Sequence, residues 1–148
     1  MQVHIRPMQP DDAPAVNDLS AELGYPLSIS ETEVCIDAVL TAEGNCAFVA
    51  IIDEKIVGWI HAFKTVRVET LPFVEIAGLV VSDTHRGKGI GKKLVQRIEA
   101  WCSEIAIADL RLRCNTKRKE SHKFYRVLGF NETKEQKVFQ KKVVDFGV

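Results

Sequence analysis

Three glycines at alternate positions, in the segment Arg86-Gly87-Lys88-Gly89-Ile90-Gly91, constrain the fold of this chain more than any other feature. The segment follows the run Ile76-Ala77-Gly78-Leu79-Val80-Val81, which has no polar face and predicts a central strand covered on both sides. Beyond it, an apolar stripe predicts a helix that begins near Gly89: Ile90, Leu94, Ile98 and Trp101. A buried strand followed by a glycine-rich turn and an amphipathic helix indicates an α/β fold.

Local signals elsewhere in the chain predict the remaining elements. Asp11 and Asp12 are suited to cap a first helix that Gly24 ends, and Ser30-Glu31-Thr32-Glu33 has the pattern of a capping box for a second. Strands are predicted over residues 47–52, 56–60, 73–81 and 109–114, a last helix around 124–128, and an extended segment after it. The predicted order is β-α-α-β-β-β-α-β-α-β, in a single domain over residues 1–148.

Composition limits the classes of function. The 148 residues suffice for one domain with a buried core, and 46% of them are hydrophobic. Twenty basic and twenty acidic residues cancel, so no overall field attracts nucleic acid or a membrane, and any anion site must be local. No signal-peptide core and no run of ~20 apolar residues is present, so we expect a cytoplasmic protein. The four cysteines lack metal-ligand spacing, so we expect buried reduced thiols and no metal.

The glycine-rich segment has the properties of an anion site. Glycines at a strand-to-helix turn let backbone N–H groups point into one concavity, and the helix dipole adds partial positive charge there. Four cations surround the same place: Arg86, Lys88, Lys92 and Lys93. A diphosphate is the ligand that such a site suits best.

Two well-known phosphate loops do not fit this segment. The P-loop requires a glycine where Arg86 stands and a serine or threonine where Lys93 stands, and the dinucleotide fingerprint requires a glycine at Lys92. The segment has the form Gln/Arg-x-x-Gly-x-Gly/Ala instead, and with its strand and helix it closely resembles the Gcn5-related N-acetyltransferase (GNAT) superfamily. The resemblance covers most of the chain. It implies a mixed central sheet flanked by helices, and a loop that binds the pyrophosphate of acetyl-coenzyme A.

A second segment resembles the same family. The stretch from His122 to Phe130 contains Phe124-Tyr125 and Gly129-Phe130, and is similar to the family's Phe-Tyr-x-x-x-Gly-Phe motif. The resemblance implies that Tyr125 lies beside the thioester sulfur and assists departure of the coenzyme thiolate. A phenol of pKa ~10 that protonates a thiolate whose acid has a pKa of ~8.5 works uphill by about 1.5 units. Tyr125 is therefore predicted to hydrogen-bond the sulfur rather than to transfer its proton fully.

The resemblance also implies how the rest of the coenzyme is held. The family's fourth strand bulges and separates from the fifth, and the pantetheine arm lies in the gap like an extra strand. Gly78, in an otherwise bulky strand, predicts such a bulge or the close approach of a ligand. Asn115 is expected either to reach the pantetheine or acceptor, or simply to end a strand. The predicted coenzyme-binding residues are Leu79, Val80, Val81, Arg86, Gly87, Lys88, Gly89, Ile90, Gly91, Lys92, Asn115 and Tyr125.

Acyl transfer to an amine also requires a base, because an alkyl ammonium of pKa ~10.4 is only about 0.04% neutral at pH 7. Glu75 stands 11 residues (86 − 75) before Arg86, the spacing at which the histone-acetylating branch of the family keeps its base glutamate. His61 competes with it, because its ordinary pKa of ~6.5 needs no adjustment. A plain strand-end charge at Glu75 and a structural role for His61 stay open as alternatives.

The acceptor side is less well specified. By resemblance, the first two helices, their connection and the loop before the central strand line the acceptor cleft, which points to four residues: Glu22, Tyr25, Glu69 and Phe73. Their acidic character favours a cationic amine of a small molecule or a peptide. We expect direct attack in a ternary complex, since Cys114 has no evident histidine partner that would make it a nucleophile.

Three questions stay open at this level. A binding module that senses acyl-coenzyme A without turnover has the same signatures. A basic cluster also suits nucleic acid, although by resemblance it lies beside the adenosine phosphates: Arg111, Arg113, Lys117, Arg118 and Lys119. Propionyl or succinyl donors and a homodimer, which is frequent in the family, are compatible with the sequence as well.

Overall fold

The computed structural model describes residues 2–24, 26–114 and 118–144. The chain divides into two compact units, residues 1–113 and 114–148, and each is described by itself. Within the described residues, no helix combines the length and the apolar character that crossing a membrane requires.

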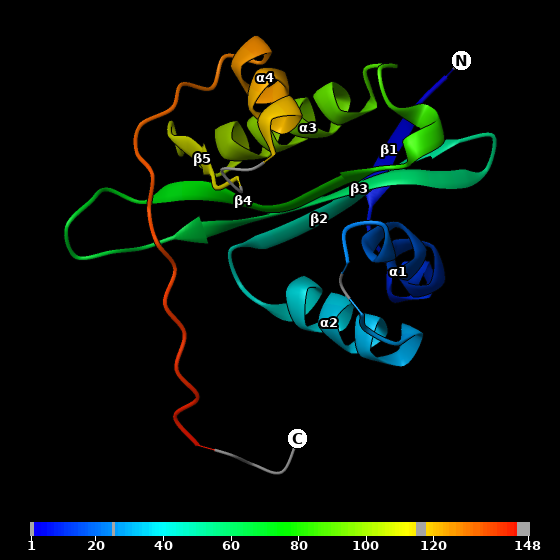
Figure 1. The fold of residues 1–148 in the computed structure, drawn as a ribbon, viewed down its shortest axis with the longest axis horizontal. Helices are drawn as coiled ribbons and strands as arrows, with labels where there is room; N and C mark the ends of the chain where they lie inside the picture. Colours follow the sequence, from blue (N-terminus) through cyan, green and yellow to red (C-terminus); the bar gives the residue numbers. More distant parts are fainter. Residues whose placement is uncertain (1, 25, 115–117, 145–148) are drawn as a thin grey trace. The chain divides into compact units, whose positions relative to one another are not determined.

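A five-stranded sheet forms the centre of the first unit, in the order β1-β2-β3-β4-β5 (Figure 1). The strands are β1 (His4–Pro7), β2 (Asn45–Ile52), β3 (Lys55–Thr65), β4 (Phe73–Val81) and β5 (Leu110–Leu112). The first four are antiparallel neighbours, and β5 is parallel to β4. This mixed sheet confirms the predicted fold class, and β4 has the predicted bounds.

Helices cover both faces of this sheet (Figure 1). A short 3-10 turn (Pro10–Asp12), α1 (Ala13–Ala21) and α2 (Ile29–Thr41) lie on one face, which we call the acceptor face. A second 3-10 turn (Asp83–His85) leads through the glycine-rich segment into α3 (Ile90–Glu104), on the opposite face. α3 buries three residues of the predicted stripe, Ile90, Leu94 and Ile98, together with Val95 and Cys102, whereas Trp101 is only half-buried.

The two N-terminal helices begin differently from the prediction. The Asp12 carboxylate does not cap α1; it accepts two hydrogen bonds of 2.8 Å from the Arg6 guanidinium and one from the backbone of Gln9. The capping box of α2 joins Ser28 and Glu31, two residues before the predicted position. Ser28 and Ser30 both fit the pattern of a capping box, and the structure uses Ser28.

A bulge interrupts the pairing of β3 with β4. His61 is opposite Gly78, and Ala62 is opposite Ile76, so Ala77 is an extra residue in β4. A β-carbon added at Gly78 would lie 2.7 Å from Cη2 of Trp59. The predicted bulge is confirmed, and the glycine is required because the indole of β3 crosses this position.

The second unit contains α4 (Lys119–Val127) and a helix end built from the predicted motif. Gly129 has φ +94°, its N–H donates to the Arg126 carbonyl, and the N–H of Phe130 donates to the Tyr125 carbonyl. This is a Schellman motif, in which the residue after the glycine packs on the last helical turn. The Phe130 and Tyr125 rings make that contact, 5.9 Å apart and edge to face.

The predicted final strand is wrong for the part of the chain that is described. Residues 128–144 have no regular secondary structure, and their apolar side chains, such as Val138 and Phe139, are exposed. A strand requires a hydrogen-bonded partner, and no described strand pairs with this segment.

Candidate functional site

The glycine-rich turn has the backbone of an anion site. Gly87 and Gly89 have φ of +76° and +80°, a backbone conformation that residues with a side chain rarely adopt. No atom lies within 4 Å of a β-carbon added at either position. Gly89 is the N-cap of α3, and no side chain caps this helix. The N–H groups of the first turn therefore have no side-chain cap, and the helix dipole favours negative charge near them.

Cations surround this turn, as predicted. Lys88, Lys92 and Lys93 are exposed, and among the described residues none has a carboxylate within ion-pair distance. Arg86 pairs with Asp83 at 3.1 Å, in an exposed ion pair of little energetic weight. The three lysines therefore present positive charge that no described carboxylate neutralises.

β4, which leads to the glycine-rich turn, also presents backbone N–H and C=O groups. β5 pairs only with Val74, Glu75 and Ile76, so beyond Ile76 the β5 side of β4 has no strand partner among the described residues. Ser82 N–H donates to the Val57 carbonyl, and residues of an antiparallel ladder alternate between facing the neighbour and facing away. The register therefore turns the N–H and C=O groups of Leu79 and Val81 toward the open side.

Two predicted coenzyme residues contribute differently. The backbone of Val80 faces β3 in this register, and its side chain is buried, so no group of Val80 faces the gap. The Ile90 side chain is also buried in the core, and only its backbone N–H belongs to the anion site. Asn115 lies outside the described residues.

Glu75 projects on the acceptor face, where the prediction requires a base. It pairs with Phe63, and His61 is two residues from Phe63 on the same strand, so all three side chains share this face. The Glu75 side chain is only 15% exposed, and its Oε1 lies 3.3 Å from Nε of Arg113. A largely buried carboxylate with one arginine partner is thus present at the predicted position.

Arginines also cover Phe73, which was predicted to line the acceptor cleft. The ring is 1% exposed, with the guanidinium carbon of Arg111 3.9 Å and that of Arg67 5.2 Å from its centroid. Phe73 is therefore a buried residue, and its place beside the acceptor cleft stays a prediction. Arg111 and Arg113 contact the first half of β4, at Phe73 and Glu75, and their place beside the adenosine phosphates stays a prediction.

His61 is held by a second polar side chain. Its Nε2 lies 2.8 Å from Oδ1 of Asn45 on β2. An amide oxygen accepts, so Nε2 donates and Nδ1 carries the free lone pair. Burial lowers the pKa of His61, which keeps the imidazole neutral near pH 7.

In the second unit, Tyr125 lies in the last turn of α4. Its ring packs edge to face against Phe124 at 5.2 Å, in addition to the contact with Phe130. Burial, and then the nearby Cys114, raise the pKa of Tyr125 above its ordinary value. A raised pKa makes full proton transfer to a thiolate still less favourable and leaves hydrogen bonding as the better role.

The remaining predicted residues lie at exposed or undescribed positions. Glu22 follows the last residue of α1, and Glu69 lies in the β3–β4 loop; both are exposed. Tyr25 is outside the described residues. Within the described residues, no group of three or more His, Cys, Asp or Glu side chains could hold a metal ion.

The cysteines only partly match the prediction. Burial raises the pKa of Cys46 to about 12 and also raises that of Cys102, so both remain protonated thiols. Cys35, however, is exposed.

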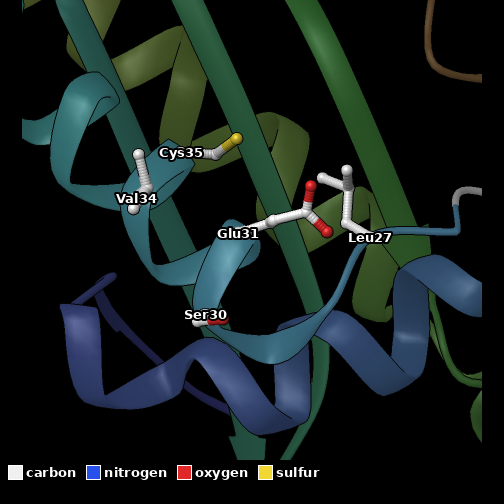
Figure 2. A pocket seen from close by; sticks show the side chains of 5 residues that line it. All are labelled: Leu27, Ser30, Glu31, Val34 and Cys35. Carbon is white, nitrogen blue, oxygen red and sulfur yellow. The ribbon is translucent and has the colours of Figure 1, made fainter. Parts of the chain in front are cut away.

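A pocket on α2 was not predicted. It has a volume of about 370 Å³ and is lined by Leu27, Ser30, Glu31, Val34 and Cys35 (Figure 2). The helix turns Thr32 and Ile36 toward the core and leaves Val34 exposed. The i, i+3, i+4 spacing from residue 27 to residue 35 was the available signal.

Solved structures share this fold. One is the aminoglycoside 6'-N-acetyltransferase AAC(6')-Ih from Acinetobacter baumannii, with a TM-score of 0.85 and 21% identity over 97% of this chain and 100% of the other. Another is AAC(6')-Iy in complex with the bisubstrate analogue CoA-S-monomethyl-acetylneamine, with a TM-score of 0.84 and 20% identity over 96% and 99%. At this identity the likeness concerns the fold alone.

Curated relatives share shorter segments. An aminoglycoside N(6')-acetyltransferase type 1 from Acinetobacter baumannii is 29% identical over 75 residues, 51% of this chain and 51% of the relative. Streptothricin acetyltransferase from Escherichia coli is 30% identical over 88 residues, 60% and 48% of the two proteins. The chain thus spans about half the length of these relatives. The acetyltransferase (GNAT) family model matches residues 14–130, more than half of the chain, and the protein therefore belongs to the GNAT family.

Proposed function

We propose that this protein transfers the acetyl group of acetyl-coenzyme A to a primary amine of a small molecule or peptide, by direct attack in a ternary complex. The observation that carries the proposal is the continuity of the open edge of β4 with the glycine-rich turn. Leu79 and Val81 direct unpaired backbone groups to one side of the strand, and the strand leads to the N-terminus of α3. A ligand with an amide-bearing arm and a diphosphate suits both parts.

The proposed binding of coenzyme A follows from these groups. N–H groups at the start of α3, with Lys88 and Lys92, would hold the pyrophosphate, and Gly87 and Gly89 leave room for its close approach. The backbone of Leu79 and Val81 would pair with the amides of the pantetheine arm. No metal takes part in this scheme.

The reaction needs one group that takes a proton from the ammonium and one group that stabilises the departing thiolate. The amine nitrogen attacks the thioester carbonyl carbon and forms a C–N bond. The C–S bond then breaks, the thiolate departs, and the proton that the attacking nitrogen sheds passes to the thiolate or to solvent. Glu75, directly or through water, is proposed to take the proton that the ammonium must lose first. Tyr125 is proposed to donate a hydrogen bond to the developing thiolate. His61 is a second candidate for the base, because its neutral imidazole lies on the same face.

We propose that residues 1–148 act as one N-acetyltransferase domain, because the family match includes parts of both compact units. The names of the relatives support an amine acceptor, and the exposed carboxylates of Glu22 and Glu69 suit a cationic one. The relatives extend beyond the matched segments, so the particular acceptor does not transfer from them.

A screen of amines against acetyl-coenzyme A, with a thiol reagent to detect free coenzyme, tests this function. We expect amine-dependent thiol release, with the acetylated amine identified by mass spectrometry. A Gly89→Val variant is the matched control and should show neither binding nor release. Tight coenzyme binding with no release across a broad panel would contradict the proposal and support a binding module.

A further inference from the structure

The indole of Trp59 lies over the bulge of β4. Its Cη2 and Cζ3 atoms would be 2.7 Å and 2.9 Å from a β-carbon at Gly78. The ring packs with buried residues of α1 and α2, such as Val16 and Ile36, so it lies on the acceptor face. Ala77, the extra residue of the bulge, is exposed. The indole therefore covers the glycine, while the residue next to that glycine is open to solvent.

Stability alone does not account for this indole. Its Nε1 is buried, and among the described residues no group accepts a hydrogen bond from it. A buried donor without an acceptor costs stability. A glycine inside a strand, which the indole requires at Gly78, costs stability as well. An aliphatic side chain in place of Trp59 would avoid both costs, so the pair indicates a role in binding.

The chemistry of the coenzyme arm brings the thioester to the same bulge. In the proposed binding mode the diphosphate lies at the start of α3, so the two amides of the arm pair first with Val81 and then with Leu79. The sulfur follows the second amide after two methylene groups, a distance comparable to the ~3.3 Å rise of one strand residue. The sulfur would therefore reach Gly78. The gap ends there, because Ile76 already pairs with Leu112 of β5.

The acyl group must leave the plane of the sheet at this point, since β5 closes the gap ahead of it. The proposed base, Glu75, projects on the acceptor face, so the amine has to reach the thioester carbonyl from that face. An acyl group turned to the acceptor face lies against the edge of the indole over Gly78. The size of the space beside this edge then limits the length of the acyl chain.

We propose that Trp59 selects the acyl group of the donor: an acetyl group fits beside the indole, and a chain extended by further methylene groups collides with it. The inference rests on the proposed function and names the donor class that the same site accepts. The ring is held between the core cluster and the backbone of Gly78, so it cannot yield without a shift of the bulge. One methylene too many in such a site discriminates by about tenfold or more.

Calorimetry on the full chain tests the proposal without an acceptor, with acetyl-coenzyme A and butyryl-coenzyme A as the probes. In wild type, we expect butyryl-coenzyme A to bind about tenfold or more weakly than acetyl-coenzyme A. Trp59→Leu removes the ring edge over Gly78 and should reduce this difference to about twofold or less. Trp101→Leu is the matched control, because it makes the same change at a half-buried tryptophan of α3, and it should keep the difference.

A fluorescence measurement tests the same contact in case Trp59→Leu does not fold. The chain has two tryptophans, so in Trp101→Phe the indole emission comes from Trp59. Acetyl-coenzyme A should change this emission more than coenzyme A does, because the two ligands differ only in the acyl group. Equal spectra with the two ligands would overturn the contact between the acyl group and the indole.

The outcomes separate donor selection from the function itself. A difference in affinity that Trp59→Leu removes and Trp101→Leu keeps supports the proposal. Equal affinity for both donors in wild type, a difference that persists in Trp59→Leu, or one that disappears in Trp101→Leu overturns it. The acetyltransferase function is decided separately, by amine-dependent thiol release from acetyl-coenzyme A. Absence of binding of both donors overturns the coenzyme site and the proposal together.

Discussion

The proposed coenzyme side and the proposed acceptor side of this protein use different kinds of chemical group. At the end of β4 and in the glycine-rich turn, the useful groups are backbone N–H and C=O groups, aligned by register, positive φ and a helix N-terminus. On the acceptor face they are side chains: Glu75 with Arg113, and His61 with Asn45. Backbone groups suit a ligand that is the same in every reaction, and side chains suit one that differs between proteins.

This difference predicts that the two sides will tolerate substitution differently. A backbone site depends on conformation, so a few glycines determine it and other changes nearby matter little. A side-chain site depends on which residues the sheet brings together, so many positions contribute moderately. The predictions below separate these two kinds of dependence.

The largest effect is expected for Gly89→Val. A β-branched residue at φ +80° strains the N-cap of α3 and fills the space in front of its N–H groups. We expect the Kd for coenzyme A, measured by calorimetry, to rise more than a hundredfold, roughly the loss of 3 kcal/mol.

Gly24→Val is its control, because Gly24 has φ +84° and equally open surroundings but follows α1. It should cost a similar amount of stability and leave the Kd unchanged. An equal loss of coenzyme affinity in Gly24→Val would show that backbone strain alone, rather than a phosphate site, explains the first result.

Tyr125→Phe should have the next largest effect. The change removes the hydroxyl and keeps the ring that packs on Phe124 and Phe130, so helix α4 is preserved. We expect kcat to fall by roughly tenfold to a hundredfold with the Kd for coenzyme A within a factor of two, as for loss of one hydrogen bond to a developing charge. Stopped-flow measurement of thiol release provides kcat, and an unchanged value would remove Tyr125 from the mechanism.

Gly78→Ala tests whether packing against Trp59 requires a glycine at this position. The added methyl would lie 2.7 Å from the Trp59 ring, so the indole or the bulge must shift. Overpacking of this kind costs roughly 1–3 kcal/mol, which should lower Tm by several degrees. Trp59→Leu should relieve the cost in the double variant; additive losses would mean that the indole is not the cause.

The smallest effect is a pH dependence of stability through His61. Burial lowers the folded-state pKa below the ~6.5 of the unfolded chain, so the unfolded chain takes up the proton more readily. Stability from neutral His61 is therefore complete above about pH 6.5 and is lost as the pH falls through the folded-state pKa. Tm of His61→Gln should fall less between pH 7.5 and 5.5 than that of wild type, by a few °C at most, whereas exposed His4→Gln should behave as wild type.

Local patterns predicted most of the fold. Residues 73–81, the helix that begins at the glycine turn and the stop at Gly129 are each determined by a few neighbouring residues. The final strand failed because pairing requires a partner far away in the chain. The cap of α2 failed because two nearby serines fit the same pattern, and only the packed structure selects Ser28.

The backbone conformation at the end of β4 was likewise predictable, and the side-chain contacts on the acceptor face were not. The open backbone of Leu79 and Val81 follows from one strand and its register, and a bulge was indicated by Gly78. Arg113 beside Glu75 and Arg111 over Phe73 depend on the parallel alignment of β5 with β4, which no local pattern fixes. The pocket on α2 depends on how far the helix is rotated about its axis.

Residue-resolved hydrogen exchange with and without coenzyme A tests the central claim most directly. The ladder turns the amides of Val80 and Ser82 toward β3, so they should exchange slowly in the free protein, while those of Leu79 and Val81 exchange fast. Coenzyme A should slow the amides of Leu79, Val81 and the first turn of α3. Unchanged exchange at Leu79 and Val81 with bound coenzyme would contradict the account.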